Sequence, residues 1–237
     1  MLAFYCLTGR SNAGGYIGLI CIALAVGCRP FQAVYVPFLL FLLYQRLHTE
    51  HQTPTKALWH MIPYLLLPAC IALASGIFHF VRFGNPLEFG HRYLPEFSTE
   101  GGTQFALAHI LPNLRNLLRP PQWQNGALSF PTLHGFAFYL TNPLLWLAPL
   151  ALLVHRKRPS ARQWVLLASI LLHLFLLLLH RTFGGWQYGS RYLCDLLPAL
   201  LLLRTDAHPS LRKDECVCMG LLMLFNLYGG LIFHQLG

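Results

Sequence analysis

Long apolar runs constrain this chain more than any other feature. Residues 57–80, ALWHMIPYLLLPACIALASGIFHF, are long enough to cross the hydrocarbon core of a bilayer as a tilted helix. Only 11% of the residues are charged, whereas a soluble domain carries about 25% and can cover its surface with them. We therefore predict an all-α, polytopic transmembrane helical bundle that forms a single integral membrane domain over residues 1–237. About seven membrane segments are expected, near 14–28, 31–45, 57–80, 131–154, 163–180, 192–203 and 216–235.

Prolines interrupt two of these runs. The first two runs meet at the sequence GCRP, residues 27–30. Proline disfavours helical geometry in the residue before it, so we predict a tight reversal or a broken helix there. The run at 192–203 is short and contains Pro198, which predicts a helix that spans only part of the membrane.

Basic residues predict which loops face the cytoplasm. The chain has 17 Lys+Arg against 8 Asp+Glu, and three short linkers at 44–56, 155–162 and 204–215 are basic. Cytoplasmic loops of membrane proteins carry such an excess. The loops 81–130 and 181–190 are then extracytoplasmic. Because the positive charge is explained by topology, we predict a lipid bilayer as partner and no nucleic acid.

The long loop 81–130 contains the pattern of an interfacial helix. Its apolar residues recur at helical spacing with two arginines beside them: Leu107, Ile110, Leu111, Leu114, Leu117 and Leu118, with Arg115 and Arg119. A helix of this kind lies in the membrane interface. We expect Pro112 to break or restart it and Pro120-Pro121 to end it.

Cysteine and histidine spacing predicts no metal site and no cofactor. The seven cysteines are scattered, and Cys216 and Cys218 form a C-x-C that lacks a second ligand pair nearby. The 12 histidines form no H-E-x-x-H or similar grouping. We interpret the cysteines as small apolar residues.

Arginines accompany glycines and aromatic residues in three stretches expected at the extracytoplasmic face. They are GCRPF with Arg29, VRFGNPLEFGHRYLPEF at 81–97, and TFGGWQYGSRYLCDLLP at 182–198 with Arg191. A guanidinium at this boundary is suited to a phosphate or diphosphate. The alternative is interfacial anchoring, in which the nearby aromatic rings form an ordinary membrane belt. Asp195 follows Arg191 by four residues, which predicts an ion pair one helical turn apart.

Together, the motifs RFGNPLEFGHRYLPEF, GCRP within a helix pair, and GWQYGSRYLCDLLPAL resemble polytopic bacterial membrane glycosyltransferases of the C type. These are similar in kind to protein mannosyltransferases and lipid-A sugar transferases, and the resemblance covers roughly residues 14–205. It implies transfer of a hexose or pentose from a polyprenyl-phosphate donor to an extracytoplasmic acceptor, in a multi-pass protein of the bacterial inner membrane. By the same resemblance, Arg29 and Arg191 bind the donor phosphate, and the cleft is lined by Arg92, Tyr93, Trp186, Tyr188 and Asp195.

One departure from the family concerns the catalytic acid. The family places an acidic residue in the first extracytoplasmic loop, but here no Asp or Glu precedes Glu50, which lies in a predicted cytoplasmic linker. The start MLAFYCLTGR resembles the end of a helix. Both features predict an N-terminally incomplete protein, inactive alone. Glu88 is the first candidate for the catalytic base, ahead of Glu96 and Glu100.

Two other functions remain open on the sequence. The first is a non-catalytic membrane protein of the same ancestry that binds polyprenyl-phosphate lipids. The second is a transporter or flippase, which is less favoured because transporters place ionisable residues within paired repeats. Here the ionisable residues gather at one face, and no internal repeat is found. The sequence identifies neither the sugar nor the acceptor.

Overall fold

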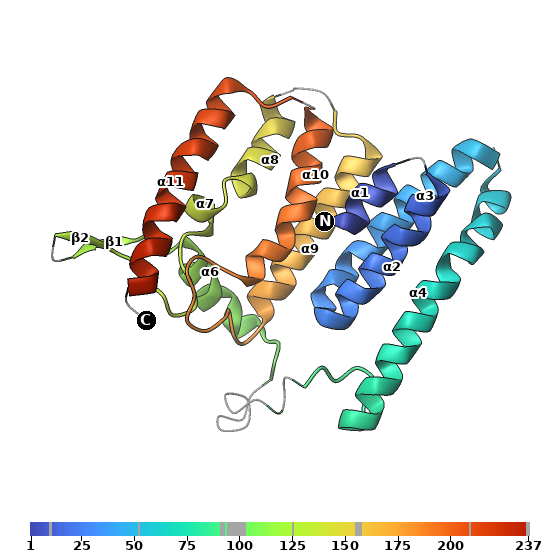
Figure 1. Cartoon of the computed structure of the whole chain (residues 1–237), viewed down its shortest axis with the longest axis horizontal. Helices are drawn as coiled ribbons and strands as arrows, with labels where there is room; N and C mark the ends of the chain where they lie inside the picture. Colours follow the sequence, from blue (N-terminus) through green and yellow to red (C-terminus); the bar gives the residue numbers. More distant parts are fainter. Residues whose placement is uncertain are drawn as a thin grey trace. The chain divides into compact units, whose positions relative to one another are not determined.

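The chain forms two compact, mostly helical units. The computed structural model describes residues 1–9, 11–51, 53–90, 93, 103–124, 126–154, 158–208 and 210–235 (Figure 1). Residues Met1–Gly102 form unit 1, and residues Thr103–Gly237 form unit 2. Their boundary falls inside the long loop predicted at 81–130. A single membrane domain that includes both units stays a prediction.

Unit 1 is built from helices that pack on one long helix. Its elements are α1 (Leu2–Thr8), α2 (Asn12–Cys28), the 3-10 helix η1 (Pro30–Tyr35), α3 (Val36–His51) and α4 (Pro54–Phe83). Helices α2 and α3 both pack on α4. The predicted break is confirmed: α2 ends at Cys28, Arg29 is extended with φ −144° and ψ 99°, and η1 starts at Pro30.

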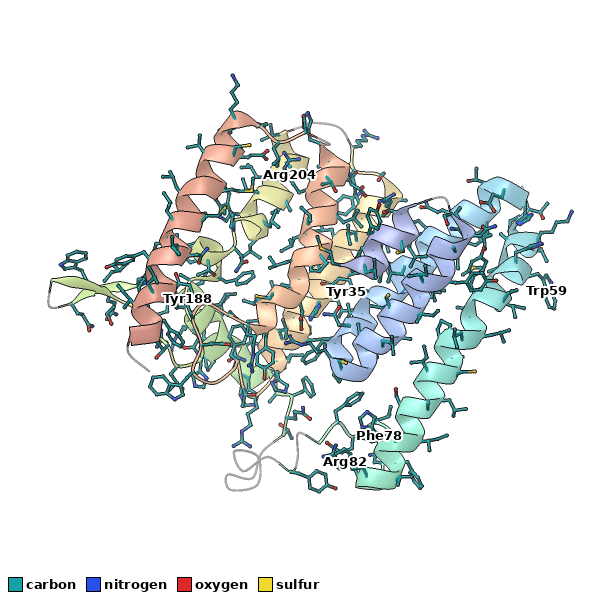
Figure 2. The ribbon with its side chains drawn as sticks, viewed as in Figure 1. Tyr35, Trp59, Phe78, Arg82, Tyr188 and Arg204 are labelled. Carbon is teal, nitrogen blue, oxygen red and sulfur yellow. The ribbon has the colours of Figure 1, made fainter. Side chains whose placement is uncertain are left out.

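The core of unit 1 joins α1 to η1. The ring of Tyr35, which is fully buried, lies edge-on to Phe4 with centroids 5.3 Å apart (Figure 2). At the other end, Arg46 of α3 donates to the Ser11 carbonyl at 2.9 Å and to the Tyr64 hydroxyl at 3.2 Å. Tyr64 in turn donates to Asn12 at 3.2 Å. One arginine therefore ties α2, α3 and α4 together at this end.

Unit 2 contains five longer helices and several short elements. The helices are α6 (Ile110–Leu118), α8 (Leu144–Val154), α9 (Ala161–Leu179), α10 (Leu197–Ala207) and α11 (Lys213–Gln235). The short elements are η3 (Leu107–His109), β1 (Gln122–Gln124), β2 (Ala127–Ser129), α7 (Phe138–Thr141) and η4 (Tyr192–Leu196). Helix α10 packs on both α8 and α9. Strands β1 and β2 pair as an antiparallel hairpin.

Among the described residues, three helices are long and apolar enough to cross a membrane: Pro54–Phe83, Ala161–Leu179 and Lys213–Phe233. Their most apolar windows are only 11%, 28% and 6% buried. Such exposed apolar surface requires an apolar surrounding, so the prediction of a helical membrane protein is confirmed. Helices α2 and α8 are apolar but shorter. The total of seven membrane segments stays a prediction.

Two predicted segments have a different structure from the expected helices. Within 131–154, the chain is non-helical up to Ala137 because His134 and Gly135 have φ of 63° and 80°, which a helix does not allow. The segment 192–203 begins as the 3-10 helix η4 and becomes α-helical only at Leu197. A 3-10 turn takes three residues, so the expected separation of Arg191 and Asp195 by one α-helical turn is wrong.

The predicted amphipathic helix is confirmed as α6. Helix η3 precedes it, and Pro112 falls in the first turn of α6, where its missing N–H removes no intrahelical bond. Arg119 ends the helix ahead of the two prolines. The side chain of Asn113 donates to the carbonyls of Leu178 and His180 at 2.9 and 2.8 Å. These bonds fix α6 to the end of α9.

Two of the predicted cytoplasmic loops meet at one end of unit 2. The Nε atom of Arg162 lies 2.7 Å from the Asp206 carboxylate, and Gln163 donates to the Asp206 carbonyl at 3.1 Å. Ser160 starts α9 with a reciprocal capping box with Gln163. The regions 158–162 and 204–215 therefore share an end, as the alternation of loops requires. Their cytoplasmic location stays a prediction.

Candidate functional site

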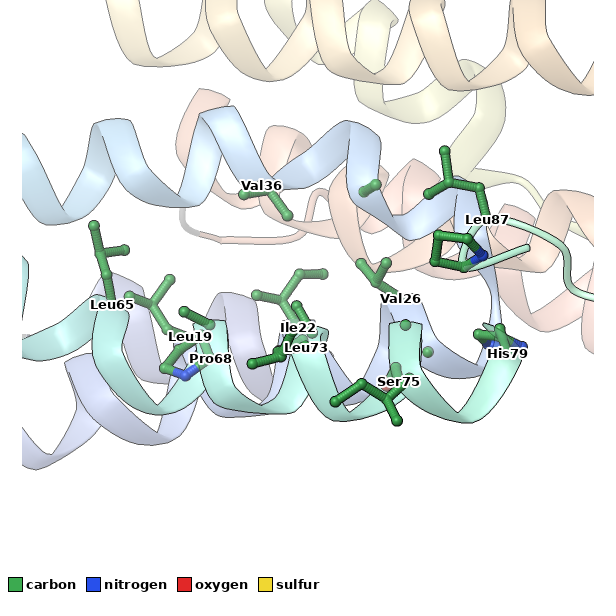
Figure 3. Close-up of a pocket in the computed structure, with 18 of the residues that line it drawn as sticks. Leu19, Ile22, Val26, Val36, Leu65, Pro68, Leu73, Ser75, His79 and Leu87 are labelled. Carbon is green, nitrogen blue, oxygen red and sulfur yellow. The ribbon is translucent and has the colours of Figure 1, made fainter. Parts of the chain in front are cut away.

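An apolar groove of about 780 Å³ lies within unit 1, between α2, α3, α4 and the residues that follow α4 (Figure 3). Binding pockets in proteins typically have volumes of roughly 300–1,000 Å³. Along α4 the lining runs from Leu65 to Phe80, which is roughly 22 Å at 1.5 Å per residue. The groove is therefore long enough for an extended hydrocarbon chain to lie along it.

Small residues on one face of α4 create the groove. Ala69, Ala72 and Gly76 line it and recur every three or four residues, so they share a helix face. A Cβ atom added to Gly27 of α2 would lie 3.3 Å from Ser75 Oγ. The end of α2 therefore approaches α4 closely at Ser75, and this contact marks one end of the groove.

The groove becomes polar and positively charged toward this end. Ser75 and His79 both line it. Arg82 follows three residues after His79, and its guanidinium lies 5.1 and 5.9 Å from the ring centroids of Phe83 and Phe78 (Figure 2). Because Gly27 contacts Ser75, the predicted phosphate ligand Arg29 also belongs to this end of unit 1. An anion would be favoured here.

The segment after α4 brings two predicted residues to the same end. Glu88 lies between Leu87 and Phe89, which both line the groove. Its Oε1 atom accepts the backbone N–H of Gly90 at 2.9 Å. The ring of Tyr93 stacks on Phe83 with centroids 5.2 Å apart. Glu88 and Tyr93 thus lie near the groove, while Arg92, Glu96 and Glu100 fall outside the described residues.

In unit 2, the predicted residues Trp186, Tyr188 and Arg191 lie in the segment 180–191, which packs against the segment 130–141. We call these two segments the loop junction. Backbone bonds join them: Gln187 to Thr132 at 2.9 Å and His134 to Gly185 at 3.1 Å. Gly135 has φ 80°, and a Cβ atom there would lie 2.0 Å from the Gly189 carbonyl oxygen. Only glycine fits this contact.

The loop junction uses its aromatic residues in two ways. The ring of Tyr188 packs edge-on to Phe130 and Phe136, with centroids 5.4 and 5.0 Å apart, and its hydroxyl donates to the Phe225 carbonyl at 3.4 Å. Burial raises the pKa of Tyr188 to about 12. Trp186 is 78% exposed. Tyr188 therefore contributes to packing against α11, whereas Trp186 lies at the surface. That the two residues line a cleft stays a prediction.

Arg191 and Asp195 have contacts that sequence spacing did not predict. The Arg191 guanidinium lies 5.8 Å from the Tyr192 ring centroid, and its backbone N–H donates to Gln187 at 3.2 Å. The Asp195 carboxylate interacts electrostatically with His173, a fully buried residue of α9. Electrostatic coupling of Arg191 and Asp195 stays a prediction.

Two histidines of the site were missed in the sequence. His79 and His173 interrupt apolar runs, and an ionisable residue within a membrane segment is a functional candidate in itself. The spacing of metal ligands, by contrast, gives no signal at either residue. Among the described residues, no group of three or more His, Cys, Asp or Glu side chains could hold a metal ion.

The two predicted phosphate ligands lie in different units, Arg29 in unit 1 and Arg191 in unit 2. Their approach to one another stays a prediction. The chain matches no protein-family model, no curated protein and no solved structure. Its function is therefore argued from the groove and the residues around it.

Proposed function

We propose that this protein is a membrane glycosyltransferase of the C type that binds a polyprenyl-phosphate sugar in the groove of unit 1. The observation that carries the proposal is the groove itself, which is apolar along α4 and polar at the end near Ser75, His79 and Arg82. A polyprenyl-phosphate sugar has the same two parts, a long hydrocarbon tail and an anionic head. The donor's tail fits the apolar length, and its phosphate fits the basic end.

The chemistry follows from the groups near this end. In an inverting transfer, the Glu88 carboxylate takes the proton of the acceptor hydroxyl. The acceptor oxygen bonds to the anomeric carbon as the bond from that carbon to the phosphate oxygen breaks. The electron pair leaves with polyprenyl phosphate, and the guanidinium group of Arg29 stabilises the negative charge. The acceptor and the phosphate stay on the extracytoplasmic side.

One observation favours a second function, lipid binding without transfer. The Oε1 atom of Glu88 already accepts the Gly90 N–H at 2.9 Å, as a carboxylate does when it stabilises a turn. Reconstituted protein with a polyprenyl-phosphate sugar distinguishes the two functions. Transfer that is lost in E88Q supports the enzyme, whereas lipid binding without any transfer agrees with the binding protein and with the inactive, N-terminally incomplete enzyme predicted from the sequence.

The groove is tested by filling it. Ala72→Phe places a ring in the groove, whereas Ala74→Phe places the same ring on an exposed part of α4 that does not line it. Binding of radiolabelled polyprenyl phosphate to the purified full chain in detergent is the measurement. We expect at least a tenfold loss for A72F, or about 1.4 kcal/mol, and no change for A74F. Equal binding by A72F and wild type contradicts the proposal.

Lysine variants test whether binding needs the planar guanidinium of each arginine or only its charge. Arg29→Lys and Arg191→Lys retain the charge but lose the planar fork that matches phosphate. We expect severalfold weaker binding for R29K and a larger loss for R29A, whereas R191K tests the prediction from the sequence that Arg191 also binds the phosphate. Arg212→Lys is the control, because Arg212 is an exposed residue paired with Asp214. If R29K and R191K bind like wild type, both arginines are membrane anchors.

A further inference from the structure

We infer that His79 holds the phosphate of the lipid through its Nδ1 atom, which fixes the direction in which the lipid lies in the groove. The inference rests on the proposed function and adds a residue and an orientation to it. His79 lines the groove and only 9% of its surface is exposed. Its Nδ1 atom is buried and has no hydrogen-bond partner among the described residues.

Other histidines of the chain bond to the backbone through Nδ1. Four of them place Nδ1 within 2.6–2.8 Å of a backbone carbonyl oxygen: His60 with Lys56, His134 with Gly184, His180 with Thr182, and His208 with Ser210. His60 lies on α4, as His79 does, and bonds to the carbonyl four residues earlier. A histidine on this helix can therefore satisfy Nδ1 internally, and His79 does not.

Aromatic rings lie close to His79. Its ring centroid lies 4.5, 5.6 and 6.2 Å from the ring centroids of Phe89, Phe78 and Phe83. A buried polar atom without a partner destabilises the fold, and natural proteins retain few of them. A ligand atom that accepts a hydrogen bond in the groove removes this cost on binding. The imidazole donates from Nδ1 in the corresponding tautomer or when protonated.

The neighbouring groups specify a phosphate as the acceptor. Arg82 lies one turn beyond His79 on α4, and the turn that contains Arg29 lies beyond the Gly27–Ser75 contact. Two cations at this end of unit 1, against the one carboxylate of Glu88, favour an anion over a neutral hydroxyl. Ser75 lines the groove one turn before His79 and supplies a further donor. Phosphate has enough oxygens to accept from several donors at once.

This contact orients the whole lipid. With its phosphate at His79, the tail extends toward Leu65 at the other end of the lining, as Figure 3 shows for the course of the groove. The sugar then lies on the far side of the phosphate, toward the segment of Glu88 that follows α4. The orientation thus brings the anomeric carbon toward the proposed base.

Three substitutions distinguish a hydrogen bond from His79 Nδ1 to the phosphate from a role of the His79 ring in packing alone. In asparagine, the amide nitrogen occupies roughly the place of Nδ1, and in glutamine it occupies that of Nε2. We expect H79F and H79Q to weaken binding of polyprenyl phosphate about tenfold or more, and H79N to stay within a few-fold of wild type. Binding of polyprenol, which has the same tail but no phosphate, should be unchanged in all three. The matched control is H60F, on the same helix but outside the groove lining.

The outcomes distinguish this inference from the proposed function. If H79F binds polyprenyl phosphate like wild type while A72F does not, the role of His79 is wrong and the groove stands. If H79F loses binding of polyprenyl phosphate and binding of polyprenol equally, the substitution has changed the shape of the groove. This result also overturns the role of His79. No binding by wild type overturns both proposals. If H79F does not fold, equal binding by H79Q and H79N overturns the inference.

Discussion

In unit 2, the loop junction pairs its polar groups within the chain, whereas in unit 1 the groove leaves a buried nitrogen unpaired. At the junction, Arg119 donates to the Leu133 carbonyl at 2.8 Å and His134 bonds to Gly184. Arg119 Nε and Ser190 Oγ are exceptions there. The ring of His79 in unit 1 lies among aromatic rings and lines the groove. The comparison indicates that hydrogen bonds within the chain hold the junction together, whereas His79 Nδ1 has no partner among the described residues.

The largest effect should come from breaking the internal pairing of unit 2 at the end away from the junction (Figure 2). Arg204 pairs with Glu215, with Nε 2.8 Å from Oε1, and also donates to the His208 and Ser210 carbonyls. Arg204→Met leaves these acceptors buried and unpaired, which costs about 3–5 kcal/mol. The midpoint of thermal unfolding in detergent should fall sharply.

An exposed ion pair provides the control for the thermal midpoint of R204M. Arg212 and Asp214 form an exposed pair at 2.7 Å, and such pairs contribute about 0–1 kcal/mol. R212M should therefore melt close to wild type. The double variant R204M/E215M should recover part of the loss, because it leaves no single buried charge. If R204M melts like R212M, internal pairing does not hold unit 2 together.

A smaller effect should come from the loop junction itself. Gly135→Ala adds a methyl group that would lie 2.0 Å from the Gly189 carbonyl, at a residue with φ 80°. Gly126 has a similar φ of 78° but open space around its Cα. G126A therefore measures backbone strain alone, roughly 1–3 kcal/mol, and G135A should lose more. Equal thermal midpoints for the two variants would show that the close contact at Gly135 does not matter.

The smallest effect concerns pH at the junction. Burial raises the pKa of Tyr188 in the folded state from 10.0 to about 12. As the pH rises above 10, the unfolded chain loses this proton first, so the contribution to stability is present below pH 10 and is lost between pH 10 and 12. Y188F should show a shallower fall of the thermal midpoint over this range. Parallel curves for Y188F and wild type would contradict burial of the phenol.

Long apolar sequences predicted the spanning helices well. The runs at 57–80, 163–180 and 216–235 became α4, α9 and α11, because a helix in lipid needs length and hydrophobicity and little else. Residues 131–137 also belong to a predicted run, but Phe136 and Ala137 are buried in the loop junction. Hydropathy alone cannot distinguish a side chain that meets lipid from one that meets protein.

The candidate site was predictable in part. Glycine, arginine and aromatic residues in GCRP and the segment around Glu88 indicated the two stretches that now flank one end of the groove. The groove itself needs small residues from three helices to face one another, and no local pattern encodes that meeting. Whether His79 Nδ1 has a hydrogen-bond partner depends on the groups packed around it, which is a tertiary property as well.

Helix α4 is longer than the layer it has to cross. Lys56 and Arg82 bracket its apolar stretch and lie 26 residues apart, or about 39 Å at 1.5 Å per residue, whereas the hydrocarbon core is about 30 Å thick. The helix relieves this hydrophobic mismatch by tilting or by extending its charged ends among the lipid headgroups. A thicker bilayer lets it stand more upright. The depth at which α4 presents His79 therefore depends on the thickness of the surrounding membrane.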